Sequence, residues 1–122
     1  MLRKSLSVGI VVVLAAVLAA TALARHSSTP TLVGTVGPGY TIHLTKAGVA
    51  VKTLKAGAYK LVIRDKASIH AWSLDGPHGY AKDFTKIPFV GSKTFAVNFK
   101  AGKYKYYCPN HESIMFGHFT VK

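Results

Sequence analysis

Short runs of alternating apolar and polar residues, broken by glycine or proline every eight to twelve positions, constrain the fold of this chain more than any other feature. Residues 40–44, 59–64 and 95–99 alternate with a period of two, which places successive side chains on opposite faces of a β-strand. No window shows the sustained spacing of an amphipathic helix. Many short strands separated by turn residues predict an all-β, antiparallel sandwich or barrel.

Turn chemistry gives further strand boundaries. The pattern K-A-G-x-Y occurs at residues 55–59 and again at 100–104. Glycine supplies the positive φ of a tight turn, so the tyrosine two positions later is expected to begin the next strand. Residues 75–92 have the poorest periodicity and are expected to form a long crossing connection, which a Greek-key β-sandwich requires. The remaining strands are expected at 49–54, 68–74, 104–108 and 118–121.

The N-terminus has the three parts of a secretory signal peptide. Arg3 and Lys4 precede an apolar run at residues 8–20, and a small-x-small sequence follows at 22–24. The run is shorter than the ~20 residues that a spanning helix needs, which favours a cleaved leader over an uncleaved membrane anchor. We therefore expect export to a periplasm or to the exterior. The expected parts are a signal peptide at 1–24, a flexible tail at 25–31 and a copper-binding domain at 32–122.

Positive charge is the main compositional bias. The formal charge of the chain is +12, and removal of the leader takes away Arg3 and Lys4 but no acidic residue, which leaves +10. The lysines are spread along the chain, as expected for solvated strand faces and for edges protected against aggregation. The alternatives are attraction to an acidic protein or to an anionic membrane surface. Nucleic acid is not an expected partner, because the chain is predicted to be exported and has no recognition motif.

The single cysteine, Cys108, points to metal chemistry. The chain has no second cysteine for an internal disulfide, so a thiol in an oxidising compartment needs another reason. The spacing C-x2-H-x3-M places Cys108, His111 and Met115 in one loop, and His70 lies 38 positions before the cysteine on an expected strand. A thiolate, two imidazoles and a thioether are the ligands of a trigonal copper site with a weak axial methionine. Each residue alone is explained as core filler or an ordinary strand histidine, whereas their joint spacing favours copper.

Residues 32–122 resemble the cupredoxin family of small blue-copper proteins, near plastocyanin, pseudoazurin and amicyanin. The resemblance rests on D-x4-H-x-W at 65–72, G-P at 76–77, A-G-K-Y at 101–104, and the C-x2-H-x3-M loop followed by G-H-F-T-V at 117–121. It implies a Greek-key sandwich with one copper ion, cycling between Cu(I) and Cu(II), at one end beneath the last loop. Carried over residue by residue, the implied ligands are His70, Cys108, His111 and Met115.

Two positions depart from the family pattern. Relatives often have asparagine directly after the first histidine ligand, whereas this chain has Ala71. Relatives also often have proline directly before the second histidine ligand, whereas in this chain Pro109 comes first and Asn110 precedes His111. That asparagine commonly hydrogen-bonds the residue after the cysteine, so both ends of this tie are lost together. The Ala71 N–H is still expected to donate to the Cys108 sulfur. The change bears on the rigidity of the site and on its reduction potential.

The other polar candidates are expected to have structural roles. Trp72 is expected to pack in the core beneath the metal, and His118 lies close to the ligand loop in sequence. Exposed histidines and solvated turn acids are expected at His26, His43, His78, Asp65 and Glu112.

Three functions remain open on the sequence. The first is an exported, monomeric one-electron carrier with an acidic redox protein as partner, in which the electron leaves through His111, ringed by Pro109, Ile114 and Phe116. The second is a copper-binding and trafficking protein of the cell envelope. The third is a copper-free binding module, which predicts missing ligands, and none is missing. An enzyme is not expected, because one small domain with a single four-ligand site offers no second metal and no evident substrate pocket.

Overall fold

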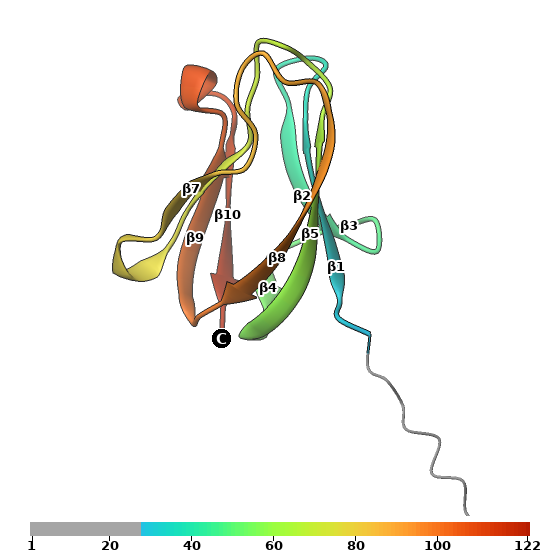
Figure 1. The fold of residues 1–122 in the computed structure, drawn as a ribbon. Helices are drawn as coiled ribbons and strands as arrows, with labels where there is room; N and C mark the ends of the chain where they lie inside the picture. The colour runs from blue at the N-terminus through green and yellow to red at the C-terminus, as the bar shows by residue number, and fades with distance from the viewer. Residues whose placement is uncertain (1–27) are drawn as a thin grey trace, which may run out of the picture.

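Two five-stranded β-sheets face each other in the computed structural model, which describes residues 28–122 (Figure 1). This arrangement confirms the all-β sandwich. Strand β1 begins at Thr31, the last residue of the expected tail, and the expected leader lies outside the described residues. The elements are β1 (Thr31–Val36), β2 (Ile42–Lys46), β3 (Val49–Ala50), β4 (Thr53–Leu54), β5 (Gly57–Asp65), β6 (Ser73–Asp75), the 3₁₀ turn η1 (Pro77–Gly79), β7 (Ala81–Asp83), β8 (Gly91–Phe99), β9 (Gly102–Tyr107), the 3₁₀ turn η2 (Pro109–His111) and β10 (Phe116–Val121).

The strand order shows where the chain changes sheets. The first sheet has the order β3-β2-β1-β5-β8, and the second has the order β4-β10-β9-β6-β7. Most neighbours are antiparallel, as expected, but β1 pairs with β5 and β4 pairs with β10 in the parallel sense. Both exceptions arise because the chain leaves the first sheet after β3, adds β4 to the second, and returns as β5 beside β1. A period-two pattern specifies a strand but not the direction of its neighbour.

The core lies between the sheets and follows the predicted alternation. In β5 the side chains of Tyr59, Leu61 and Ile63 are buried, whereas the intervening Lys60 is exposed. Trp72 is fully buried, with its indole stacked on Tyr106 at a centroid distance of 5.7 Å, which confirms its expected place in the core. The buried apolar cluster contains Leu32, Val36, Ile42, Leu44, Val51, Leu54, Tyr59, Leu61, Ile63, Trp72, Leu74, Phe84, Phe99, Tyr104, Cys108, Met115, Phe119 and Val121.

The two K-A-G-x-Y turns behave alike at one end of the sandwich, here called the far end. Gly57 and Gly102 have φ of +135° and +147°, a region that residues with a Cβ rarely adopt. Two residues after each glycine, a tyrosine hydroxyl closes the turn by donating to a backbone carbonyl four positions back. Tyr59 donates to the Lys55 carbonyl at 2.6 Å, and Tyr104 donates to the Lys100 carbonyl at 2.9 Å. The predicted turns are confirmed.

Two segments differ from the expected organisation. Strand β6 covers only Ser73–Asp75, so His70 lies in the loop before it rather than on a strand. The reason is that Trp72 bonds to residues 84 and 85 through its backbone N–H and carbonyl, outside a regular ladder. The expected crossing connection at 75–92 contains η1 and β7, and only residues 84–90 pass between the sheets. Within residues 28–122, no helix is long and apolar enough to span a membrane.

Candidate metal centre

Three loops meet at the end of the sandwich opposite the far end, here called the metal end. Residues 37–41 join β1 to β2, residues 66–72 join β5 to β6, and residues 108–115 join β9 to β10. The second loop carries His70, and the third carries Cys108 and His111. The ligand atoms of these three residues all lie within 4.8 Å of one another. The structure therefore brings together three predicted site residues that span 41 positions of sequence.

The separations of these atoms suit a single small ion. The Nδ1 atoms of His70 and His111 are 3.2 Å apart, and the Cys108 Sγ lies 3.9 Å from the first and 3.6 Å from the second. Two nitrogens bound about 2.0 Å from one ion at a near-tetrahedral angle lie about 3.3 Å apart. A nitrogen and a thiolate sulfur bound at about 2.3 Å lie about 3.5 Å apart. The donor atoms are thus close to a ligating arrangement.

The site is buried on every side except one. His70 and Cys108 are fully buried, and Met115 is 1% exposed, whereas His111 is partly exposed. The ligand loop closes on itself, because the Cys108 N–H donates to the Met115 carbonyl at 3.0 Å and the Met115 N–H donates to the His111 carbonyl at 2.8 Å. Met115 therefore occupies the buried end of the predicted loop, and its role as axial ligand stays a prediction.

The Cys108 sulfur has the hydrogen bond that was predicted from the sequences of the two ligand loops. The Ala71 N–H donates to the Cys108 Sγ at 3.5 Å, as expected. Sulfur accepts hydrogen bonds weakly, and Ala71 and Pro109 provide no side-chain tie between their loops. Direct hydrogen bonding between the two loops is therefore sparse.

Asp65 was expected to be a solvated turn residue, and that expectation is wrong. Its side chain is 1% exposed at the end of β5 and accepts a hydrogen bond from the Ala67 N–H at 3.3 Å. Burial raises the pKa of the Asp65 carboxyl, while Thr85, the Ala67 N–H and the charge of His70 act in the opposite direction. Within residues 28–122, the buried Asp65 Oδ2 and His70 Nε2 have no hydrogen-bond partner. The alternation of buried residues in β5 continues from Tyr59, Leu61 and Ile63 to Asp65, so the strand pattern agrees with this burial and the acidic residue type led to the wrong expectation.

The remaining histidines lie apart from the cluster. His43 and His78 are exposed, as predicted, and His26 lies outside the described residues. His118 is also exposed, and its ring packs against Phe116 at 5.7 Å. Glu112 is exposed in the ligand loop and forms an ion pair with Lys105 at 2.8 Å.

Tyr40 is the residue at this end that sequence reasoning missed. Its ring lies edge to face against both imidazoles, 5.4 Å from that of His70 and 5.1 Å from that of His111. It comes from the 37–41 loop, far from either histidine in sequence, whereas the sequence pattern placed it at the start of a strand expected at 40–44. No signal in a single sequence identifies this contact.

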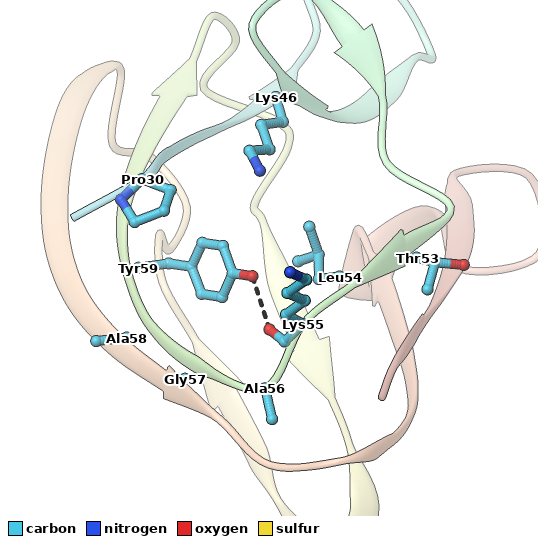
Figure 2. A pocket seen from close by; sticks show the side chains of 9 residues that line it. All are labelled: Pro30, Lys46, Thr53, Leu54, Lys55, Ala56, Gly57, Ala58 and Tyr59. Atoms are coloured by element: carbon cyan, nitrogen blue, oxygen red, sulfur yellow. Dashed lines mark hydrogen bonds between the residues drawn. The ribbon is translucent and has the colours of Figure 1, made fainter. Parts of the chain in front are cut away.

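A cavity lies at the far end, away from the metal end. It has a volume of about 410 Å³, and Figure 2 shows Lys46, Lys55 and Tyr59 around it. Its lining contains no histidine, cysteine or carboxylate. The cavity is therefore separate from the metal centre.

Comparison with solved structures agrees with this arrangement. A structure of the copper protein rusticyanin is 19% identical, with a TM-score of 0.56 over 77% of this chain and 78% of that one. Rusticyanin from Thiobacillus ferrooxidans is 22% identical, with a TM-score of 0.52 over 77% of each chain. A reduced amicyanin variant is 15% identical, with a TM-score of 0.51 over 75% of this chain and 82% of that one. This chain has the cupredoxin fold.

The cupredoxin fold is supported here by structure and not by close sequence relatives. No protein-family model matches the chain, and no curated protein matches it. Rusticyanin and amicyanin have been solved in reduced states, and amicyanin also in an oxidised state. In this chain the cupredoxin fold carries its three convergent donors at the metal end, on the loops that follow β5 and β9.

Proposed function

We propose that this protein is an exported blue-copper protein that carries single electrons between redox partners. The observation that carries the proposal is the convergence of the His70, Cys108 and His111 ligand atoms within 4.8 Å. One sulfur and two imidazole nitrogens, with a buried methionine in the same loop, match the donor set of a trigonal copper site. Copper held there would supply a one-electron Cu(I)/Cu(II) couple. The fold shared with the copper protein rusticyanin supports this choice of metal.

The burial of the ligands favours electron transfer over metal delivery. His70 and Cys108 have no exposed surface, so a receiving protein cannot reach them without opening a loop. His111 is the one donor of the three that meets solvent. An electron can leave through the edge of this imidazole without any change of ligand, whereas delivery of the metal requires ligand exchange.

The surface around His111 suits contact with another protein. Apolar side chains at the metal end are unusually exposed, among them Tyr40 at 59% and Ile114 at 62%. Isolated exposed apolar residues are ordinary, but several around one functional atom mark an interaction surface. Ile69, Pro109 and Phe116, which lie in or next to the loops at the metal end, are also exposed. The positive charge of the chain points to an acidic redox partner, with the protein itself acting as a monomer.

Addition of Cu(II) to the purified protein tests the proposal. We expect an intense thiolate-to-copper charge-transfer band in the visible spectrum and a narrow copper hyperfine splitting in the EPR spectrum. Cys108→Ser is the matched control, because it keeps a hydroxyl in place of the thiol and should lose the band. A weakly coloured wild-type complex with wide hyperfine splitting would contradict the proposal. Rapid loss of the metal to a mild chelator would favour copper trafficking instead.

A further inference from the structure

Three aromatic rings meet edge to face at the metal end. The Tyr40 ring makes an interplanar angle of 69° with that of His70 and of 83° with that of His111. The two imidazoles themselves cross at 80°, with their centroids 4.9 Å apart. An edge-to-face contact places the positive edge of one ring against the negative face of another, and is attractive beyond the area that it buries. Each of the three rings therefore restrains the other two.

The loop that carries Tyr40 is itself held in place. The Gly37 N–H donates to the Thr41 carbonyl at 2.9 Å across the turn, and the Lys66 N–H donates to the Val36 carbonyl at 2.9 Å. Gly37 has a φ of +75°, and a Cβ at this position would lie 3.3 Å from the His70 Cδ2. The backbone of this loop thus passes directly behind the His70 ring, which fixes the position from which Tyr40 extends.

Apart from the 3.2 Å contact between the His70 and His111 Nδ1 atoms, which a bound metal ion would replace, the other restraints between the two histidine-bearing loops are weak. The Ala71 N–H to Cys108 Sγ hydrogen bond is 3.5 Å long, and neither Ala71 nor Pro109 has a side chain that can hydrogen-bond across the gap. His111 lies at the edge of the protein and is partly exposed, so its ring has solvent on one side into which it can swing. The Tyr40 ring is packed against this imidazole and also against the buried one.

We propose that Tyr40 is a positioning residue of the metal centre, which holds His70 and His111 at their ligating separation from a third loop. The inference rests on the proposed copper function and assigns a residue that no ligand motif contains. Tyr40 lies in a loop between two strands of the first sheet, and the ligand loop joins two strands of the second, so the contact also links the two sheets at this end. Because the contacts are made by the ring, phenylalanine at position 40 should preserve the positioning of the two histidines, whereas alanine should not.

Two measurements on Tyr40→Ala and Tyr40→Phe test this role. The first is the rate at which the copper-loaded protein loses metal to an excess of chelator. We expect about tenfold faster loss from Tyr40→Ala, the size of effect found when a partner that orients a metal ligand is removed, and a rate within about twofold of wild type for Tyr40→Phe. The second is the NMR relaxation of the His111 ring in the metal-free full chain, which should show larger motion only in Tyr40→Ala.

Tyr80→Ala is the control for loss of an exposed tyrosine ring. Tyr80 is 37% exposed, packs edge to face on Tyr104, and lies beside η1, away from the ligand loops. It should leave both measurements unchanged. The proposal is overturned if Tyr40→Ala matches wild type in both, or if Tyr40→Phe is as impaired as Tyr40→Ala. If wild-type protein binds no copper, the proposed function fails, and the ring relaxation of the metal-free chains still decides whether Tyr40 restrains His111.

Discussion

The imidazoles of His70 and His111 direct their Nδ1 atoms at each other across 3.2 Å, although the two residues are 41 positions apart in the chain. Two neutral imidazoles can share one hydrogen bond at this distance, whereas two imidazolium rings would repel. A metal ion bound to both nitrogens removes that conflict. The pair therefore places a histidine from outside the ligand loop in the candidate metal centre, and it leads to the first prediction.

His70→Ala should abolish the blue colour of the copper-loaded protein. Without the second imidazole the site keeps one nitrogen and one sulfur donor from the cluster, which is too few for the trigonal arrangement. Visible absorbance after Cu(II) addition is the measurement. His43→Ala is the matched control, since His43 is an exposed histidine whose backbone carbonyl, and not its ring, accepts the Trp72 indole N–H. A blue His70→Ala protein would show that another residue supplies the second nitrogen.

Met115→Leu should keep the blue band and raise the reduction potential. A weak axial thioether stabilises Cu(II) modestly, so its replacement by an apolar side chain of similar volume favours Cu(I). The backbone hydrogen bonds through which Met115 closes the loop are unaffected by this change. Voltammetry of the two proteins gives the comparison. Complete loss of colour would mean that the thioether is more than a weak ligand, or that the loop collapses without it.

The candidate ligands were accessible to sequence reasoning because three of them share one short loop. Cys108, His111 and Met115 are fixed relative to one another by a few backbone bonds, so their spacing alone carries information. His70 was predicted to lie on a strand at 68–74, whereas β6 begins only at Ser73 and a turn at residues 68–69 precedes the histidine. Local pattern cannot show where a backbone hydrogen bond goes when its partner is distant.

The metal-free protein should remain folded and melt at a lower temperature than the copper form. The core between the sheets is built from apolar side chains that do not depend on the metal. Binding to the native state alone adds roughly 4 kcal/mol to the free energy of unfolding when free metal exceeds the Kd a thousandfold. Calorimetry of both forms provides the check. A metal-free chain without a cooperative transition would show that the metal is structural.

Replacing Lys103 and Lys105 with glutamate should slow association with an acidic redox partner by about tenfold at low ionic strength. The structure refines this test, because the Lys105 ammonium pairs with Glu112 and lies 5.2 Å from the centre of the Phe116 ring. Lys103 lies next to Gly102 at the far end, so steering near His111 is expected from Lys105, and Glu112→Gln removes the ion pair while it keeps that lysine. The visible spectrum should stay fixed, since exposed charges are screened beyond about 8 Å at physiological salt.

Lysines at the far end provide the control for steering. Lys46→Glu and Lys55→Glu change the net charge equally, but they border the cavity remote from His111 (Figure 2). Stopped-flow rates across a range of ionic strength compare the two sets. Equal slowing by both sets would assign the effect to net charge, and unchanged rates in every variant would restrict the lysines to solubility and edge protection.

Tyr107→Phe should lower stability at neutral pH but not in strong alkali. The hydroxyl of Tyr107 donates to Asp75 at 3.0 Å, and burial, followed by the hydrogen bond and charge of Asp75, raises its pKa to about 12. An ordinary tyrosine ionises near 10. The folded state thus holds this proton more tightly, so its stabilisation is complete below pH ~10 and is lost as the pH rises through 12.

Urea denaturation of wild type and Tyr107→Phe measures this difference. We expect about 1 kcal/mol at pH 8, the usual contribution of one hydrogen bond, and a declining difference above pH ~10. The ultraviolet absorbance of tyrosinate should also show one late-titrating tyrosine that Tyr107→Phe removes. Asp75→Asn should bring that titration to lower pH. A difference that grows with alkalinity would contradict the assignment.

Parallel pairing and tertiary contacts were beyond what alternation could predict. The chain passes from β3 in the first sheet to β4 in the second and back to β5 in the first. Which sheet each strand joins depends on which sheet offers a free edge, and the residues of the strand do not specify this choice. Tyr40 is the corresponding case at the metal end, because its ring contacts His70 and His111, which are distant in the chain. The burial of Asp65, in contrast, continues the alternation of its own strand.

The paired tyrosine turns of the far end have a consequence for how the molecule tolerates change. Tyr59 and Tyr104 close equivalent turns in opposite sheets, and both rings contact Phe99, with centroids 5.6 and 5.1 Å away. This end therefore forms a stiff base whose backbone amides should be the last to exchange with solvent. Exposed residues of the loops at the metal end, such as Ile114, should then tolerate substitution better than the residues that close these two turns. Surface properties around the candidate metal centre could thus change while the base preserves the architecture.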